Sequence, residues 1–349
     1  MNISFDNISK KYGKKTAIVN FNEQFCHGEV TALLGPSGCG KTTLLNMLAG
    51  IIEPTDGTIY FDGIKVDQSL LEQYNIGYVF QNYSLYPNMT VSKNISFPLS
   101  NMKFANMQKK ERKQHIDQKV HEIATMLKIE DLLDRYPSEL SGGQQQRVAI
   151  GRALVKNPDI LLMDEPFANL DKKLAIELRD EIRNIQQDLG ITLIFVTHNQ
   201  NDAAMISDKV ILLNNGRVQQ AGKAEELYAY PCNQFVAEFM GEVGLNVINI
   251  SSLNSDPAFN KFKVDCMRVN SIAFRPEHII INCCLDKDFS GFWVHNVVCN
   301  GHYFTVFLKS KSGICIKAFT NKPFEIDQKV TIDVEKMLLF DSNGALVQL

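Results

Sequence analysis

The 349-residue chain lacks several features that would assign it to a class at once. Its apolar runs fall short of the ~18 residues that a membrane-spanning helix needs, and its first residues lack the basic and apolar regions of a signal peptide. Its eight cysteines form no C-x-x-C pair and no Cys/His cluster at zinc spacing, which argues for reduced, structural thiols. A formal net charge of -3 does not favour nucleic acid as a partner. We therefore expect a cytosolic chain that reaches a membrane only through another protein.

The chain also lacks internal repeats and low-complexity tracts. Charged residues make up 21% and hydrophobic residues 45% of it, which is typical of a globular protein. Single hydrophobic cores usually stop growing near ~250–300 residues, so the length predicts one large and one small domain.

The strongest motif present is Gly35-Pro36-Ser37-Gly38-Cys39-Gly40-Lys41-Thr42, which matches G-x-x-x-x-G-K-[ST] at every fixed position. A buried strand is predicted before it, over 29–34, and a helix after it, over 42–49. The glycines let several N–H groups turn inward, the helix N-terminus adds partial positive charge, and Lys41 adds a full one. The segment therefore predicts a cradle for a triphosphate, with Thr42 placed to offer its hydroxyl to Mg²⁺. A chance glycine-rich turn is the alternative.

Two side chains near this loop allow more than one interpretation. Cys39 lies inside the loop, where an alkylating reagent would block nucleotide binding. Tyr12 lies ahead of the core strand, where its ring could stack on a nucleobase, although a lone tyrosine more often has a packing role.

Polar side chains also follow three further predicted strands. Gln81 ends the strand 76–80, and Asp164 and Glu165 end the apolar run that starts at 160. Since α/β proteins place ligand contacts at the carboxyl ends of central strands, Gln81 is a candidate site residue. Asp164 can hold Mg²⁺, and Glu165 can accept a proton from the attacking water. His198 ends the strand 191–197, but a histidine there is more often structural when considered alone.

Residues from about 84 to 157 are predicted to form a helical insert. The charged stretch 109–113 opens one of its helices, and we favour a solvated helix face there over a membrane or partner contact. The insert ends with Leu140-Ser141-Gly142-Gly143-Gln144, a glycine-bearing turn that leads into a helix predicted from Gln144 to about Lys156. Ser141 is a plausible N-cap, and the exposed N–H groups after it suit an anion.

The rest of the chain continues the core and then changes pattern. An amphipathic helix follows Asp171 and ends at Gly190, a hairpin turns at 214–216, and helical pieces over 225–240 break at Pro231. Short alternating segments follow, which suggest a small β-barrel; they lie at 246–250, 271–274, 278–283, 303–308, 313–319 and 330–334.

Together these motifs resemble the ATP-binding cassette ATPases, the motor subunits of membrane transporters. The phosphate loop, the signature turn 140–144, the acidic strand 160–166, Asp171 and His198 occur in the family's order. The resemblance covers about residues 1–240 and implies an α/β fold, in which a P-loop NTPase core carries an antiparallel β subdomain and a helical insert (about 84–157). It implies that 1–240 is the nucleotide-binding domain and 241–349 a small all-β barrel domain with an accessory or regulatory role. The chain would then be an enzyme that hydrolyses ATP.

The resemblance also implies roles for individual residues. Tyr12 would stack on adenine, Gln81 would join Mg²⁺ and the lytic water, and His198 would contact the γ-phosphate. The implied catalytic residues are Glu165, His198, Lys41 and Gln81, and the implied Mg²⁺ ligands are Thr42, Gln81 and Asp164. The implied nucleotide-binding residues are Tyr12, Gly35, Pro36, Ser37, Gly38, Cys39, Gly40, Lys41, Thr42, Thr43, Ser141, Gly142, Gly143, Gln144 and Asp171.

The implied partners follow from the signature turn, which in this family binds the nucleotide held by the opposite subunit. The resemblance thus implies a homodimer with two composite ATP sites and with Asp171 at the dimer seam. The helical insert and the loop 81–88 would carry motion to integral membrane permease subunits. The protein would lie at the cytoplasmic face of the inner membrane as a peripheral subunit, with no nucleic-acid partner.

The C-terminal region narrows the resemblance. Phe274-Arg275-Pro276-Glu277-His278-Ile279 is similar to the R-P-E segment in the barrel of importer ATPases of the maltose, polyamine, sulfate and ferric-iron type. This implies uptake that is fed by an extracytoplasmic solute-binding protein, and the short tail favours ferric iron, with sugar and polyamine as alternatives. A non-transport cassette ATPase acting on ribosomes or DNA is the rival class. One departure is Asn199, since the family's histidine is usually followed by aspartate.

Overall fold

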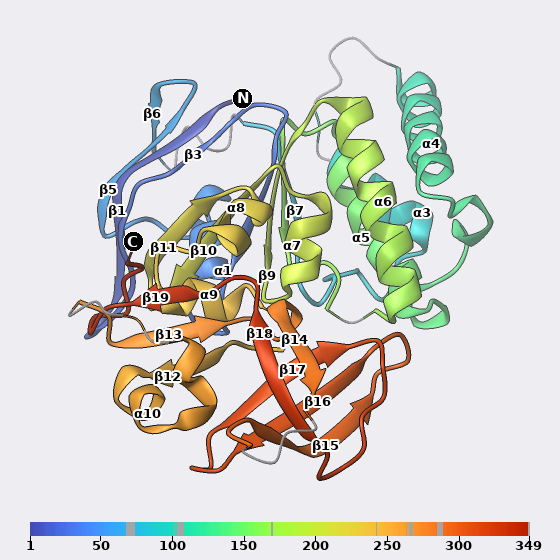
Figure 1. The fold of residues 1–349 in the computed structure, drawn as a ribbon. Coiled ribbons are helices and arrows are strands. Elements are labelled where there is room, and N and C mark those ends of the chain that lie inside the picture. Colours follow the sequence, from blue (N-terminus) through green and yellow to red (C-terminus); the bar gives the residue numbers. More distant parts are fainter. Residues whose placement is uncertain are drawn as a thin grey trace. The chain divides into compact units, whose positions relative to one another are not determined.

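The central feature of the fold is a six-stranded sheet that the apolar runs of the sequence build (Figure 1). The computed structural model describes residues 1–67, 74–100, 102, 108–168, 170–241, 243–262, 264, 268–284 and 289–347. The strand order is β11-β10-β4-β9-β8-β7, and all neighbours are parallel except the hairpin pair β10 and β11. The strands span Val30–Leu34 (β4), Ile76–Val79 (β7), Ile160–Asp164 (β8), Thr192–Thr197 (β9), Lys209–Asn214 (β10) and Arg217–Gly222 (β11). Every residue of β4, β8 and β9 is buried, which explains their near-continuous hydrophobic sequences.

A second, antiparallel sheet is built from the N-terminal part of the chain. Its strands are Ile3–Tyr12 (β1), Lys15–Phe21 (β2), Gln24–Phe25 (β3), Asp56–Phe61 (β5) and Ile64–Val66 (β6). Helix α1, Lys41–Leu48, shares one hydrophobic cluster with both sheets, in which Phe5 and Phe21 join Leu44, Leu48 and Leu33. The phosphate loop is therefore anchored on two sides, by β4 before it and by α1 after it.

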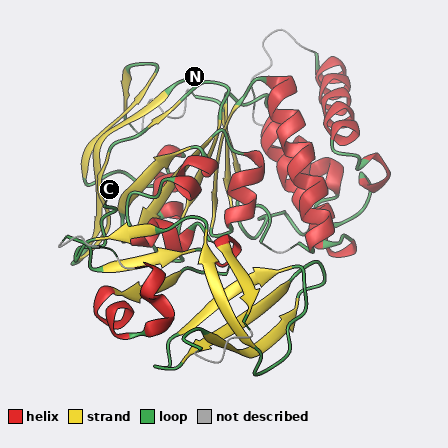
Figure 2. Ribbon diagram, viewed as in Figure 1, coloured by secondary structure: helices red, strands yellow, loops and turns green. Residues whose placement is uncertain are grey.

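Helices make up much of the segment between β7 and β8, as predicted for the insert (Figure 2). They are Val91–Ser100 (α3), Lys109–Met126 (α4) and Gly142–Leu154 (α5), with 3₁₀ turns at Glu130–Leu132 and Pro137–Glu139. Helix α5 begins two positions before the predicted start, because the Ser141 side chain caps it.

Two more helices follow the acidic strand. Helix α6, Lys172–Leu189, is capped by Asp171 at its start and ends at Gly190, which has the left-handed φ of 60° that suits glycine. Helix α7, Gln200–Ile206, starts directly after the end of β9 and is capped by Asn199. Side-chain caps therefore define the starts of both helices.

The described chain divides into two compact units, 1–225 and 226–349. This division lies earlier than the predicted boundary at 240. The physical reason is the packing of helix α9, Gln234–Phe239, whose Ala237 shares a cluster with Ala273, Leu338 and Phe340. Helix α8, Ala224–Ala229, crosses the division. The assignment of separate functions to the two units stays a prediction.

The second unit is rich in β-structure, as predicted. A three-stranded sheet is formed by Asn246–Asn249 (β12), Ser271–Phe274 (β13) and Leu338–Phe340 (β19). A five-stranded sheet has the order β14-β18-β15-β16-β17, with strands Ile279–Cys283, Lys329–Val334, Phe292–Cys299, Phe304–Ser310 and Cys315–Thr320. Its edge strands β14 and β17 lie close together, so this sheet curls towards closure. Helix α10 is Ile250–Ser255, and a 3₁₀ segment follows at Pro257–Phe262.

Strands β15 and β19 were not among the predicted strands. The reason for β15 is a register shift between Val294 and Asn296, which breaks the alternation by which strands are recognised. β19 has only three residues, all buried, and is too short to show a period.

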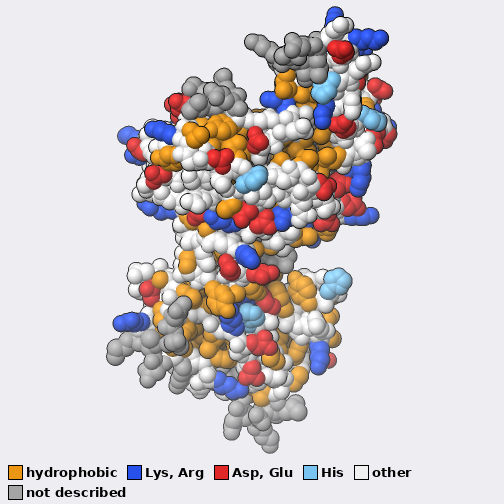
Figure 3. Space-filling model, turned by 90° about the horizontal axis from the view of Figure 1, so that it is seen from above, with side chains coloured by type: hydrophobic (Ala, Val, Ile, Leu, Met, Phe, Trp, Pro, Cys, Tyr) orange, Lys and Arg blue, Asp and Glu red, His pale blue; other side chains and the backbone are white. Residues whose placement is uncertain are grey.

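The structure bears on two expectations from the sequence, one about membrane-spanning helices and one about the cysteines. No helix in the described ranges is long and apolar enough to cross a membrane. The seven cysteines that the structure describes are free thiols, and Cys266 lies outside the described residues. Figure 3 shows Lys and Arg side chains interspersed with Asp and Glu over the displayed face, in keeping with the small net charge.

Candidate active site

A cavity of about 580 Å³ lies where strands of the first unit end. The parallel strands β4, β9 and β8 lie side by side in this order, so the segments that follow them meet at one edge of the sheet. Its described lining includes residues of the phosphate loop, other residues that the sequence predicted for the site, and some that it did not. The lining residues are Tyr12, Lys15, Thr16, Ala17, Ser37, Gly38, Gly40, Lys41, Thr42, Thr43, Gln81, Glu165, His198, Asn215 and Gly216.

The glycines of the phosphate loop are required by packing as well as by conformation. Gly40 is the N-cap of α1 with φ 109°, and a Cβ there would lie 2.7 Å from the Ala17 carbonyl oxygen. A Cβ at Gly35, with φ 152°, would lie 2.3 Å from the Leu213 carbonyl oxygen. Any larger residue would push the loop away from β2 or β10, so the loop's shape depends on both sheets.

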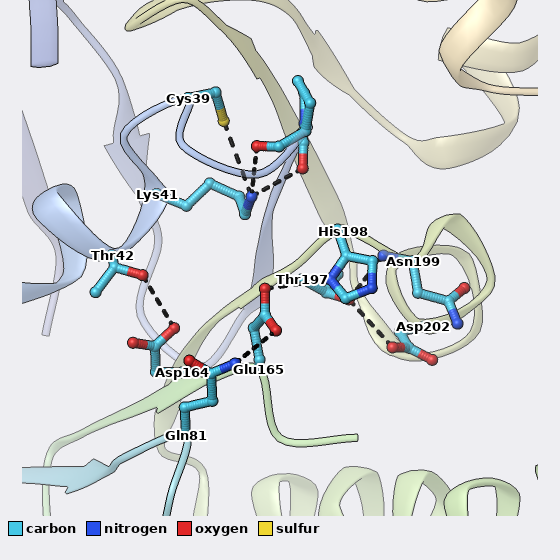
Figure 4. Close-up of polar contacts among 12 residues, drawn as sticks. Cys39, Lys41, Thr42, Gln81, Asp164, Glu165, Thr197, His198, Asn199 and Asp202 are labelled. Atoms are coloured by element: carbon cyan, nitrogen blue, oxygen red, sulfur yellow. Dashed lines mark hydrogen bonds and ion pairs between the residues drawn. The ribbon is translucent and has the colours of Figure 1, made fainter. Parts of the chain in front are cut away.

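Lys41 lies at the centre of the loop and is only 5% exposed. Its Nζ donates to the carbonyl oxygens of Gly35 at 2.8 Å and Pro36 at 3.0 Å, and it lies 3.9 Å from Cys39 Sγ (Figure 4). The hydrogen-bond acceptors of this ammonium are thus neutral, and a buried cation is costly unless an anion approaches it. Together with the helix N-terminus of α1, the loop therefore suits a phosphate group.

Cys39 differs from its predicted accessibility. The side chain is 3% exposed and packs in the cluster around α1, outside the described lining of the cavity. Burial raises the pKa of the Cys39 thiol, and the thiolate is the form that alkylating reagents attack. The prediction that a reagent would reach this thiol in the loop is wrong. Gly35 and Pro36 also lie outside the described lining, and their carbonyl oxygens accept from the Lys41 ammonium.

An oxygen-rich group lies beside the loop at the end of β8. Thr42 Oγ1 donates to Asp164 Oδ1 at 3.2 Å, and Gln81 adds an amide oxygen beside Glu165. Burial raises the pKa of the Asp164 carboxyl and the charge of Glu165 adds to this, whereas the Thr42 hydrogen bond acts in the opposite direction. Hydroxyl, amide and carboxylate oxygens are the ligands that Mg²⁺ prefers, so the predicted set Thr42, Gln81 and Asp164 fits this ion.

Glu165 connects the ends of three strands. Gln81 Nε2, after β7, donates to Glu165 Oε2 at 3.0 Å, and His198 Nδ1, after β9, lies 3.1 Å from Glu165 Oε1 (Figure 4). The Glu165 backbone has a left-handed φ of 46°, which is strained for a residue with a side chain. Its N–H donates to the Val196 carbonyl oxygen at 3.1 Å, and this hydrogen bond holds the unusual conformation. The carboxylate is therefore held at the cavity between an amide and an imidazole.

Some lining residues were not predicted from the sequence. Asn215 and Gly216 form the turn between β10 and β11, and the Gly216 N–H donates to the Cys39 carbonyl oxygen at 3.0 Å. Lys15, Thr16 and Ala17 come from the start of β2. The sequence predicted the Asn-Gly turn only as a hairpin turn. Its contact with the phosphate loop could not be predicted, because the two segments lie far apart in the chain.

Tyr12 lies at the end of β1 and lines the same cavity with half of its surface exposed. Lys10 Nζ lies 5.3 Å from the centre of its ring. An exposed ring at the cavity wall leaves a face free for stacking, so its predicted contact with adenine is geometrically open.

The signature turn and Asp171 lie elsewhere. Ser141, Gly142, Gly143 and Gln144 form the start of α5, where the Ser141 Oγ accepts from the Gln144 N–H at 3.4 Å. Asp171 caps α6, accepting from the Leu174 N–H at 3.0 Å. A Cβ on Gly143 would lie 2.3 Å from Leu174 Cδ2, so the two helix starts pack against each other. These predicted nucleotide-binding residues are all outside the described lining of the cavity.

Comparisons with known proteins agree on one family. A family model described as "ABC transporter" matches residues 18–168. The Fe(3+) ions import ATP-binding protein FbpC of Fusobacterium nucleatum is 39% identical over 314 residues, which cover 87% of this chain and 83% of that protein. The trehalose import ATP-binding protein SugC of Mycobacterium tuberculosis is 46% identical over 245 residues, which cover 70% of this chain and 61% of that protein.

A solved structure shares the architecture of the first unit. It is a dimeric post-hydrolysis state of an ATP-binding cassette bound to ADP and Pi, with 34% sequence identity and a TM-score of 0.57. The match covers 63% of this chain and 98% of that one.

Proposed function

The chain belongs to the ABC transporter family as an import-type ATPase, and from that premise we propose that it works as a homodimer that drives ferric iron uptake through membrane permease subunits. The observation that carries the chemical part is the position of Glu165 between Gln81 and His198, beside the phosphate loop. Relatives that import trehalose and sulfate support the coarser function of an import motor.

In the proposed reaction, Glu165 accepts a proton from water as the water attacks the γ-phosphate of ATP. Gln81 and His198 hold the carboxylate from opposite sides, which orients its free lone pairs. Lys41 and the N–H groups at the start of α1 stabilise the negative charge of the phosphates. Thr42, Gln81 and Asp164 would hold Mg²⁺, which supplies positive charge next to the phosphate oxygens when bound.

A homodimer is proposed because one chain supplies only part of this site. Ser141 and Gly142 are exposed at the start of α5, but the turn lies outside the cavity lining. A second copy would bring its signature turn to the phosphates bound by the first, with ATP between the two chains. The solved cassette of similar fold, which is described as dimeric, supports this arrangement.

A link to permease subunits is supported by the loop after β7. Its start, Gln81, contacts Glu165, and its next residues are clamped to the helical insert: Arg152 donates to the carbonyl oxygens of Tyr83 at 2.7 Å and Ser84 at 2.6 Å. The buried Asn94 accepts from the Tyr86 N–H at 2.8 Å. These contacts form a continuous path from Glu165 to α3 and α5, along which a change at Glu165 would reach the insert.

The same loop borders a groove of about 360 Å³ between β7 and the insert. Phe80, Tyr86 and Phe97 line it, and the first two are partly exposed. An apolar helix end of a permease fits this groove, which would complete the path from the cavity to the membrane subunits.

Ferric iron is the first candidate substrate because similarity to the iron import protein extends over 87% of the chain, beyond the first unit. Sugar and polyamine import are the alternatives. A tagged copy expressed in cells that lack the native one should recover polytopic membrane subunits and restore uptake of radiolabelled ferric iron. Recovery of ribosomal proteins instead would overturn the transport function, and restored sugar uptake without iron uptake would overturn the substrate.

The hydrolytic role is tested with Glu165→Gln, which keeps the hydrogen-bonding shape and removes the base. We expect kcat to fall about 10²–10⁴-fold while ATP binding is retained, as for loss of a general base. Asp208→Asn, at the opposite edge of the sheet, is the control and should hydrolyse ATP at the native rate. Hydrolysis at the native rate by Glu165→Gln would show that another group is the base.

A further inference from the structure

Behind the cavity, Arg179 of α6 and Asp202 of α7 form a buried ion pair between Arg179 Nη2 and Asp202 Oδ1. Both residues lie outside the described lining of the cavity. The other carboxylate oxygen, Asp202 Oδ2, accepts from Thr197 Oγ1 at 3.1 Å (Figure 4). The same hydroxyl oxygen accepts from the Asn199 N–H at 3.0 Å. The two neighbours of His198 in the chain are therefore both held by this network.

The Arg179 guanidinium also contacts the segment that follows Glu165. It lies 5.5 Å from the centre of the Phe167 ring, and Phe167 packs edge-on against Phe195 of β9. Arg179 Nη1 lies 3.3 Å from Met205 Sδ in α7. One buried side chain thus touches the segment after Glu165 and, through Asp202, the segment that carries His198.

Stability alone gives little reason for this network. Burying two charges costs desolvation energy that their attraction only partly offsets, and an apolar pair is often as stable. Burial raises the pKa of the Asp202 carboxyl, while the Arg179 charge and the Thr197 hydrogen bond oppose that shift. A planar guanidinium does offer directional contacts that an apolar pair lacks. This suits orientation of the His198 backbone, because the ring itself is 54% exposed and is little restrained by packing.

We propose that Arg179, Asp202 and Thr197 are positioning residues that hold His198 and Glu165 in register for hydrolysis. The inference rests on the proposed ATPase function of Glu165 and His198. Because the network acts through these two residues and leaves the phosphate loop unchanged, its loss should lower kcat and leave ATP binding intact.

The chain offers a matched control on the same helix. Arg183 lies one turn beyond Arg179, and its Nη2 and Nη1 contact Asp208 Oδ1 at 2.6 Å and Oδ2 at 2.9 Å. Asp208 Oδ2 also accepts from the Val30 N–H at 2.8 Å, at the amino end of β4. This second ion pair therefore ties α6 to the edge of the sheet opposite the cavity.

The test compares Asp202→Asn and Thr197→Val with Asp208→Asn in the full-length protein. We expect the first two to lower kcat about tenfold, equivalent to about 1.4 kcal/mol in activation free energy, with KM for ATP and the Kd of a fluorescent ATP analogue within about twofold. Asp208→Asn should lower the melting temperature by about as much as Asp202→Asn lowers it, but it should keep the native kcat. Thr197→Val preserves side-chain shape, so it carries the test if Asp202→Asn does not fold.

The inference is overturned if Thr197→Val and every folded Asp202→Asn sample keep the native kcat. It is also overturned if Asp208→Asn lowers kcat as much as these two variants do. A double variant locates the effect. Adding Asp202→Asn to His198→Ala should lower kcat no further than about twofold, because the residue through which Asp202 acts is already gone. If the fold-losses in kcat of the two single variants multiply in full in the double variant, the network does not act through His198. Failure of the proposed function is distinguishable, since native-rate hydrolysis by Glu165→Gln would reveal it separately.

Discussion

At the scale of single residues, features that cost stability lie in the cavity lining, at Lys41 and Glu165, and next to it, at Asp164. Lys41 and Asp164 are buried charges, and Glu165 has a left-handed backbone. Each is destabilising in isolation, by an amount on the order of 1–3 kcal/mol for the backbone conformation alone. All three lie where the proposed phosphates and Mg²⁺ would interact with them, so a bound nucleotide would recover part of the cost.

Asp164 allows a test of this idea through pH. Burial raises its pKa, so the folded state holds this proton more tightly than the unfolded state does. Stability therefore falls as the pH rises from the unfolded pKa through the raised folded pKa, and the full penalty applies above both. We expect Asp164→Asn to raise the free energy of unfolding of the nucleotide-free protein by about 0.5–2 kcal/mol at neutral pH.

Urea unfolding at neutral pH and near pH 4 measures the difference. The difference in the free energy of unfolding should shrink at the lower pH, because a larger fraction of the wild-type carboxyl is then protonated and resembles the neutral amide. In the presence of Mg²⁺ and ATP the variant should gain less stabilisation than the wild type, since binding energy adds to folding stability. A variant that is less stable at both pH values would contradict burial as the cause.

At the scale of elements, helix α6 links the separate parts of the first unit. Its first turn packs on Gly143 at the start of α5, Arg179 reaches α7, and Arg183 reaches the amino end of β4. Glu181 adds an ion pair at 3.0 Å to Arg147 of α5. The residues expected to face a second copy and those at the cavity are therefore attached to one rigid helix.

The contact between α5 and α6 leads to a prediction for Gly143→Ala. The added Cβ would overlap Leu174 Cδ2, a side-chain tip that can shift, so we expect a loss of about 1 kcal/mol in the free energy of unfolding. A displaced signature turn should also lower ATPase activity. Denaturant unfolding and steady-state hydrolysis measure the two effects.

Leu174→Ala provides the comparison, alone and combined with Gly143→Ala. Removing the Leu174 tip makes room for the new methyl group, so the alanine at 143 should cost less in the Leu174→Ala background than in the wild type. An equal cost in both backgrounds would mean that the overlap with Leu174 is not what requires glycine.

At the scale of the whole molecule, the proposed homodimer should depend on ATP. We expect Glu165→Gln to bind ATP and to accumulate as a dimer, because the nucleotide that joins the two chains is no longer consumed. Adding Ser141→Arg should abolish the dimer and preserve ATP binding, since Ser141 is exposed and outside the cavity lining. Light scattering after size exclusion and an ATP-binding assay provide both measurements.

Lys41→Met in the Glu165→Gln background is the control, and it should lose ATP binding and the dimer together. If the Ser141→Arg protein still forms an ATP-dependent dimer, the signature turn does not complete the site of a second chain.

Much of the candidate site follows from local sequence. The phosphate loop, the caps Ser141 and Asp171 and the polar residues after β7, β8 and β9 depend on neighbours within a few positions, so residue type and spacing predict them. Strands β4, β8 and β9 were predicted from their continuous buried runs. The bulged strand β15 was not, because its alternation is interrupted.

What the sequence by itself determined is therefore the chemistry available to this protein: a loop for phosphate, an acidic strand end and a signature turn. Only the tertiary structure decided which of these groups meet. Cys39 turns into the core, the Asn215–Gly216 turn reaches the loop, the signature turn stays apart from the cavity, and Arg179 joins the segments after Glu165 and His198. The physical reason is that such contacts join residues far apart in the chain, and packing of the two sheets around α1 and of α6 against α7 brings them together.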